Sequence, residues 1–163
     1  MSVLTLVFYP DARLAQPCAT VGGDDLSGLI SNMFDTMYAA PGRGLAGPQV
    51  GVMKRIFVMD CTWKEGAKTP MAFLDPEIIA ASAEKDTLDE GCLSIPGLMV
   101  PVVRSTEITV RWKDAHGTVQ EQSFDGFEAR CIQHEMDHLD GRVTLDHLSE
   151  AARADILKGY EAP

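Results

Sequence analysis

The stretch CIQHEMDHLDG, residues 131–141, constrains this chain more than any other part of its sequence. It contains two of the four histidines, His134 and His138, and Glu135 directly follows the first of them. On a helix, residues four apart lie about 40° apart around the axis, so both imidazoles share a face and can bind one metal ion. Glu135 lies roughly 60° from His138. This position suits a base that acts on a water at the open position of a metal.

The alternative interpretation is a buried helix whose two histidines bind no metal ion. Apolar residues cover the opposite side of this segment, namely Ile132, Met136 and Leu139, so the helix is expected to be central in the fold. Burying two imidazoles and a carboxylate costs free energy unless something pairs with them. A metal ion supplies that pairing, and the pattern therefore favours a metal site.

The third ligand decides the class of enzyme, and the sequence offers three candidates. His147 follows His138 by nine residues, which does not fit the H-E-x-x-H-x-x-G-x-x-H spacing, and Glu150 is a weaker candidate. Either one would indicate a metallopeptidase. Cys92, within DEGCLSIPG, lies on a segment that the sequence predicts to be irregular, where backbone can approach a site closely. For Cys18 and Cys61, a role as small buried apolar residues is sufficient.

Length and composition indicate one domain, residues 1–163, with 45% hydrophobic and 23% charged residues. The net charge of −10 argues against unspecific nucleic-acid binding, which needs clustered Lys and Arg. The longest uncharged run, Gly91–Val103, is too short to span a membrane. MSVLTLVFYP lacks the basic start of a secretory signal, so we expect a cytoplasmic protein with reduced thiols.

The periodicity of the chain predicts an α+β fold with a mostly antiparallel β-sheet packed around a central C-terminal helix. Residues 24–40 are predicted to form an N-terminal helix, and Asp125 with Glu128 resembles a capping box that begins the metal-binding helix before the stop at Gly141. A short helix is predicted over Glu150–Lys158 after Ser149. The predicted strands are residues 55–60, 71–84 with a break at Pro76, 98–104, 107–114 and 118–124, with a turn at 114–117.

Three stretches in this order and spacing resemble the peptide deformylase family: GRGLAGPQ (residues 42–49), EGCLS (residues 90–94) and QHEMDH (residues 133–138). The resemblance covers nearly the whole chain. It implies that Cys92, His134 and His138 are the metal ligands, with an open fourth position. The ion implied is Fe²⁺, and Zn²⁺ fits the same ligands.

The resemblance also implies roles for neighbouring residues. The metal would activate a water for attack on a formyl carbon, and Glu135 would act as general base and then as general acid. The side-chain amide of Gln49 and the backbone N–H of Leu93 would stabilise the oxyanion. Glu90 would pair with an arginine, here Arg104, and so position the segment that carries Cys92.

The implied substrate pocket contains Arg43, Gly44, Gly91, Phe127, Arg130 and Cys131. Two of these depart from the family pattern, because Arg43 and Arg130 stand where apolar residues are usual; Gly47 stands where alanine is common. Arginine matches carboxylates better than a thioether. The hypothesis is a pocket that favours an acidic or shorter N-formyl or N-acyl substrate. The alternatives are a solvent-pointing Arg43 and an ion pair of Arg130 with Glu128, Asp137 or another carboxylate.

The resemblance further implies a small N-formyl peptide substrate, including nascent chains. We also expect a monomer, with no nucleic-acid or membrane partner. The segment after Gly141 is mixed in charge, unlike the basic helices used for ribosome docking, so docking is not expected. A non-catalytic binding module on the same fold is a further alternative. Against it, Gln49, Cys92, His134, Glu135 and His138 are all present.

Overall fold

The computed structural model describes residues 2–163 and has the predicted α+β architecture, in which all strands pair antiparallel. One sheet has the strand order β1-β2-β3-β6-β7, and a second consists of β4 and β5. The strands are β1 (Gly44–Ala46), β2 (Ile56–Met59), β3 (Met71–Ala81), β4 (Lys85–Cys92), β5 (Ile95–Ser105), β6 (Glu107–Lys113) and β7 (Val119–Asp125). The helices are α1 (Ser27–Ala39), α2 (Gly126–Leu139) and α3 (Glu150–Leu157), with 3₁₀ turns η1 (Ala12–Ala15), η2 (Gly47–Val50), η3 (Trp63–Glu65) and η4 (Thr144–His147).

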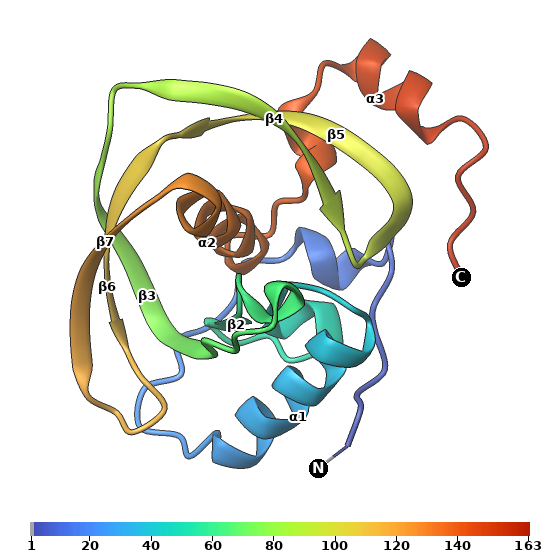
Figure 1. Cartoon of the computed structure of the whole chain (residues 1–163). Coiled ribbons are helices and arrows are strands. Elements are labelled where there is room, and N and C mark those ends of the chain that lie inside the picture. Colours follow the sequence, from blue (N-terminus) through green and yellow to red (C-terminus); the bar gives the residue numbers. More distant parts are fainter. Residues whose placement is uncertain (1) are drawn as a thin grey trace.

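Helix α2 lies in the centre of the molecule, enclosed by both sheets, whereas α1 covers the outer face of the larger sheet and α3 lies at the periphery (Figure 1). Strand β2 explains this layering, because its four residues are all buried. Phe57 packs in the cluster that contains Ile132 of α2, while Ile56 and Val58 pack with Met33 of α1. Alternate side chains of a strand point to opposite faces, so an unbroken apolar run fits a strand covered on both sides.

The central position of α2 confirms the prediction from the sequence. Eight of its fourteen residues are buried. Gly141 follows the helix with a φ of 77°, and an added Cβ would lie 2.8 Å from the backbone carbon of Gln16. Position 141, just after the C-terminus of α2, therefore requires glycine for two reasons: the backbone there is left-handed, and it approaches the N-terminal segment closely. The predicted capping box is wrong, because Asp125 is the N-cap but makes no side-chain capping hydrogen bond.

Two strand predictions differ from the structure. Strand β3 continues through Pro76 to Ala81, and the expected break appears as register shifts and a positive φ of 47° at Asp75. Strand β4 was not predicted, because most of its residues are exposed and few are apolar. Cys92 is its last residue, so it does not lie on a fully irregular segment; the irregularity is a register shift between Gly91 and Cys92.

The short helix predicted after Ser149 is confirmed as α3, which ends at Leu157, whereas η4 was not predicted. The Ser149 hydroxyl accepts a hydrogen bond from the backbone N–H of Ala152 and caps α3.

Within residues 2–163 the structure contains no helix with the length and apolarity needed to cross a membrane.

Candidate metal centre

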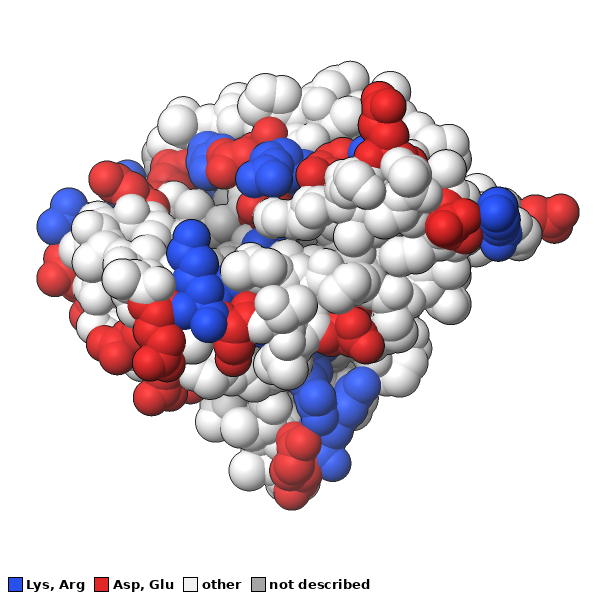
Figure 2. Space-filling view, turned by 90° about the horizontal axis from the view of Figure 1, so that it is seen from above, with Lys and Arg blue, Asp and Glu red and all other residues white. Residues whose placement is uncertain are grey.

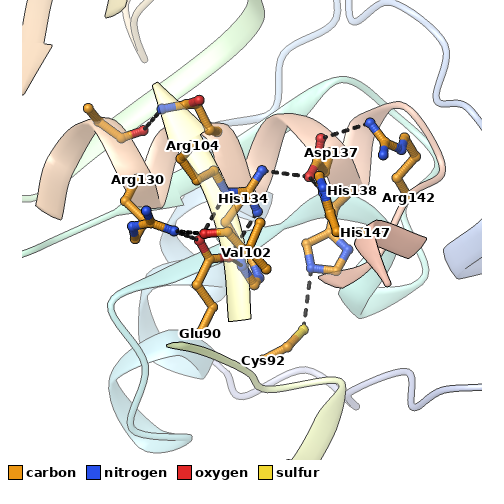
Figure 3. A network of polar contacts seen from close by, with 12 residues as sticks. Glu90, Cys92, Val102, Arg104, Arg130, His134, Asp137, His138, Arg142 and His147 are labelled. Carbon is orange, nitrogen blue, oxygen red and sulfur yellow. Dashed lines mark hydrogen bonds and ion pairs between the residues drawn. The ribbon is translucent and has the colours of Figure 1, made fainter. Parts of the chain in front are cut away.

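Three side chains that can bind a metal converge where the end of β4 meets the C-terminal half of α2. One ligand atom from each of Cys92, His134 and His138 lies within 4.8 Å of the other two. The Cys92 Sγ is 3.4 Å from His138 Nε2, and the two imidazole rings have centroids 5.1 Å apart (Figure 3). The one-turn spacing on α2 thus places both rings opposite the thiol, as the sequence predicts.

The surroundings of the imidazoles fit a divalent ion. His134 Nδ1 lies 2.9 Å from Glu90 Oε1, which leaves Nε2 for a metal; such a carboxylate partner is usual for a histidine ligand. His138 Nδ1 is buried without a hydrogen-bond partner among the described residues. Burial, together with the nearby His134, lowers the pKa of His138 well below its usual value. A neutral imidazole is the form that binds metal, so His138 is suited to be a ligand. One thiol and two imidazoles match the donors of sites with three protein ligands.

Glu90 is the most heavily contacted carboxylate near the site. Arg104 donates to both of its oxygens, at 2.9 and 2.8 Å, which confirms the predicted pairing of these two residues. Arg130 donates to Oε2 at 2.6 Å. Burial alone would raise the pKa of Glu90, but the hydrogen bonds from Arg104 and His134 outweigh it and lower the pKa. Glu90 is therefore ionised and holds His134 in one orientation.

Two residues considered as alternative third ligands do not join this group. His147 lies in η4, where its Nε2 is 2.7 Å from Asp137 Oδ2. Asp137 also accepts a hydrogen bond from Arg104 at 2.7 Å. Glu150 is exposed at the start of α3. Among residues 2–163 the group that could hold a metal is Cys92 with His134 and His138, so the metallopeptidase ligand sets find no support in the geometry.

Glu135 lies beside the three donors, with 4% of its surface exposed. Its Oε1 is buried and has no hydrogen-bond partner among the described residues. Burial raises the pKa of Glu135 to about 7. Strand β1 approaches this carboxylate closely, since a Cβ on Gly44 would lie 2.5 Å from Glu135 Oε2. A carboxyl group with a pKa near neutrality and an unused oxygen can both accept and release a proton.

Gln49 is held rigidly near the thiol. Its Oε1 accepts a hydrogen bond from the backbone N–H of Ala46, and its Nε2 donates to Ser94 Oγ at 3.1 Å and to Cys92 Sγ at 3.6 Å. Leu93 lies in the short turn between β4 and β5 and lines the same pocket. Sequence reasoning did not identify Ser94, which helps orient the amide.

A pocket of about 690 Å³ opens onto these groups. Its lining contains all six residues predicted for the substrate pocket: Arg43, Gly44, Gly91, Phe127, Arg130 and Cys131. Its lining also includes Glu135, His134, Gln49 and Lys64. Two of the candidate metal donors, Cys92 and His134, therefore share one cavity with Glu135 and the predicted pocket residues.

The two unusual arginines have different environments. Arg130 is 6% exposed, and the ion-pair alternative describes it correctly, although its partners are Glu90 and Asp86 and not Glu128 or Asp137. Arg43 does not point freely into solvent. Its Nη2 contacts Glu65 at 2.8 Å, its guanidinium lies 5.2 Å from the ring centroid of Phe127, and its Nε is buried without a partner among the described residues.

The wall of the pocket around Arg43 depends on residues that sequence reasoning missed. The Trp63 Nε1 donates to the backbone carbonyl of Gly42 at 2.9 Å. Asp60, fully buried, accepts hydrogen bonds from the backbone N–H groups of Thr62, Trp63 and Thr69. An aspartate directly after a buried strand is a common turn-forming residue, and this signal could have identified Asp60.

Acidic and basic side chains are interleaved on the face shown in Figure 2, where no continuous basic patch forms. The net charge of −10 agrees with this distribution. The face therefore lacks the clustered cations that bind phosphate backbones.

Comparisons with known proteins agree with this site. The family described as Polypeptide deformylase matches residues 3–154. Peptide deformylases of Rhodopseudomonas palustris (strain BisB5) and Zymomonas mobilis are each 42% identical; the alignments cover 99% and 97% of this chain and 94% and 93% of those proteins. The crystal structure of peptide deformylase from Ehrlichia chaffeensis in complex with actinonin is 41% identical, with a TM-score of 0.90 over 97% of this chain and 95% of that one.

Proposed function

This chain belongs to the peptide deformylase family of enzymes, and from that membership we propose that it removes the N-formyl group from formyl-methionyl peptides with the help of a divalent metal ion. Cys92, His134 and His138 would hold the ion. The family resemblance favours Fe²⁺, and the same thiolate and imidazole donors accept Zn²⁺. A bound ion would supply Lewis acidity and lower the pKa of water.

The protein groups around the donors carry the rest of the proposed reaction. Glu135 removes a proton from the attacking water and later delivers it to the departing amine, for which a pKa of about 7 is suitable. The amide of Gln49 and the backbone N–H of Leu93 stabilise the charge that develops on the formyl oxygen. Ala46 and Ser94 hold the Gln49 amide, so it does not need to reorganise during the reaction.

The observation that carries this proposal is the convergence of a thiol and two imidazoles within 4.8 Å, next to a buried carboxylate with a free oxygen. The test is anaerobic purification with metal analysis, followed by assays on a panel of formyl peptides. We expect one metal per chain and turnover of formyl-methionyl peptides. Cys92→Ala should lose the metal, whereas Cys18→Ala, outside the pocket, should keep it. Metal-free wild-type protein, or metal-loaded protein without deformylation, would contradict the proposal.

The second candidate function is hydrolysis of an acidic N-formyl substrate. Of the two arginines, Arg43 is the better candidate to bind the substrate carboxylate, because Arg130 is already occupied. The Nη groups of Arg130 already contact two carboxylates and two carbonyls. Arg43 has a buried, unpartnered Nε and one carboxylate partner, Glu65, whose side chain is 63% exposed. A substrate carboxylate could therefore compete for Arg43.

Turnover of formyl-Met and formyl-Glu peptides by wild type and Arg43→Ile separates the two candidates. For a formyl-methionyl enzyme, formyl-Met peptides should be preferred in both proteins. For an acidic-substrate enzyme, wild type should prefer formyl-Glu peptides, and Arg43→Ile should lose that preference.

A further inference from the structure

Arg130 connects helix α2 to both strands of the smaller sheet. Its Nη1 donates to Glu90 Oε2 at 2.6 Å and to the backbone carbonyl of Val102 at 2.9 Å. Its Nη2 donates to Asp86 twice, to the carboxylate at 2.6 Å and to the backbone carbonyl at 3.1 Å. Figure 3 shows the guanidinium directed at the Glu90 carboxylate, one helical turn before His134.

These contacts join the two elements that carry the metal donors. Strand β4 ends at Cys92, and α2 contains His134 and His138. Asp86 and Glu90 lie four residues apart on β4, so Arg130 holds this strand at two points along the same face. The distance between the thiol and the imidazoles depends on where β4 lies relative to α2, and Arg130 fixes that placement directly.

Arg130 also completes the contacts of the carboxylate that orients His134. Glu90 receives two N–H groups from Arg104, one from Arg130 and one contact from His134. Without Arg130, Glu90 Oε2 would keep one donor, Arg104 Nε. The carbonyls of Asp86 and Val102 would each lose one donor, and the loss of a hydrogen bond at buried Glu90 is costly.

We infer that Arg130 is a positioning residue for the metal centre: it holds β4 against α2 and so keeps Cys92, His134 and Glu90 in the arrangement that binds a divalent ion. This inference rests on the proposed metal site and not on the identity of the substrate. It assigns to Arg130 a role different from reading an acidic side chain, because its terminal nitrogens are already occupied.

The direct test is the affinity for Zn²⁺, measured by competition with a chelating indicator and independently of turnover. Arg130→Met should bind Zn²⁺ about 10–100-fold more weakly than wild type, the usual effect of disturbing the carboxylate partner of a ligating histidine, here Glu90. Arg130→Lys keeps the charge but not the planar fork, so its affinity should lie between the two. Asp86→Asn removes one ionic partner and should also weaken binding, by less than Arg130→Met.

Two control variants separate positioning from a general loss of stability. Arg111→Met breaks an ion pair with Glu121 on the exposed side of β6 and β7, where both side chains are 51% exposed. Met33→Ala removes a fully buried side chain from α1, on the far side of the larger sheet. We expect Met33→Ala to lower the melting temperature, and both controls to keep the Zn²⁺ affinity within about two-fold of wild type.

Arg130→Met protein that is folded and binds Zn²⁺ as tightly as wild type would overturn the inference. The same holds if Met33→Ala weakens binding as much as Arg130→Met does. If Arg130→Met fails to fold, unchanged affinity in Asp86→Asn and Arg130→Lys would overturn it. Wild-type protein that binds no Zn²⁺ would instead refute the metal site on which this inference and the proposed function both rest.

Discussion

Substituting Gly44 by alanine should reduce deformylation by moving the carboxylate of Glu135. The added Cβ would lie 2.5 Å from Glu135 Oε2 and 2.9 Å from Cys131 Sγ, whereas ordinary contact begins at 3.4 Å. Glu135 is buried on α2 and Gly44 is in β1, which pairs with β2, so the side chain of Glu135 moves more easily than either backbone.

The size of the effect follows from that geometry. Restoring contact from 2.5 to 3.4 Å requires a shift of about 0.9 Å in the carboxylate oxygen. Misplacing a reacting group by about 1 Å can cost roughly 100-fold in rate. At 1.36 kcal/mol per factor of ten, this is about 2.7 kcal/mol of transition-state stabilisation. Because the ligands are not displaced directly, metal content should stay stoichiometric.

Steady-state kinetics on a formyl-methionyl peptide, with metal analysis of the same sample, measures this prediction. A displaced proton-transfer group should lower kcat, whereas a blocked pocket should raise KM. Gly23→Ala is the matched control, because a Cβ there meets nothing within 4 Å. Adding Cys131→Ala to Gly44→Ala should restore little activity, since the contact with Glu135 remains.

Two results would refute the reasoning. Folded, metal-loaded Gly44→Ala that keeps kcat within about three-fold of wild type would show that the carboxylate need not move or that its position is not critical. Full recovery of kcat in the double variant with Cys131→Ala would show that the sulfur, and not Glu135, is the decisive contact.

Three further predictions concern other parts of the fold. Gln49→Leu should lower kcat by about 10²–10³-fold, because it removes a hydrogen-bond donor to the negative charge that develops on the formyl oxygen. Steady-state kinetics at unchanged metal content measures this loss, and an effect below about ten-fold would contradict the role of the amide. The Phe57 ring is fully buried, and its centroid lies 4.5 Å from that of Phe73. Phe57→Ala should lower the free energy of unfolding, measured by urea titration, by about 3–5 kcal/mol, and a loss below about 1 kcal/mol would contradict the tight packing of this ring. A chelator should lower the melting temperature of wild type but not of Cys92→Ala, because an ion that binds only the folded state stabilises it; equal shifts in both would contradict the assigned ligand.

The sequence was sufficient to predict those parts of the site that depend on local geometry. His134 and His138 share a face because of helical spacing alone, and the strand over residues 55–60 is evident from an unbroken apolar run. The sequence offered Cys92 as one of three candidate third ligands, and the resemblance of EGCLS to a family motif favoured it. No local rule places that thiol near α2, because the sequence distance between Cys92 and His138 is 46 residues.

The features that were missed depend on long-range contacts. Strand β4 consists largely of exposed and charged residues, so its pairing with β5 leaves little periodicity in the sequence. The partners of Arg130 lie 40 and 44 residues away, which explains why nearby Glu128 and Asp137 were considered first. The capping box failed for the opposite reason: the local pattern is present, but the side chain of Asp125 does not make the bond.

The coordination of the bound ion tests the central claim most directly. X-ray absorption at the metal edge of anaerobically prepared, Zn²⁺-loaded protein should show one sulfur at about 2.3 Å and two imidazole nitrogens at about 2.0–2.1 Å, with one ion per chain. Cys92→Ala, which should lose the metal, should show little bound zinc and no zinc–sulfur signal. A coordination shell without sulfur in the wild type, or a metal content far below one per chain, would contradict the account.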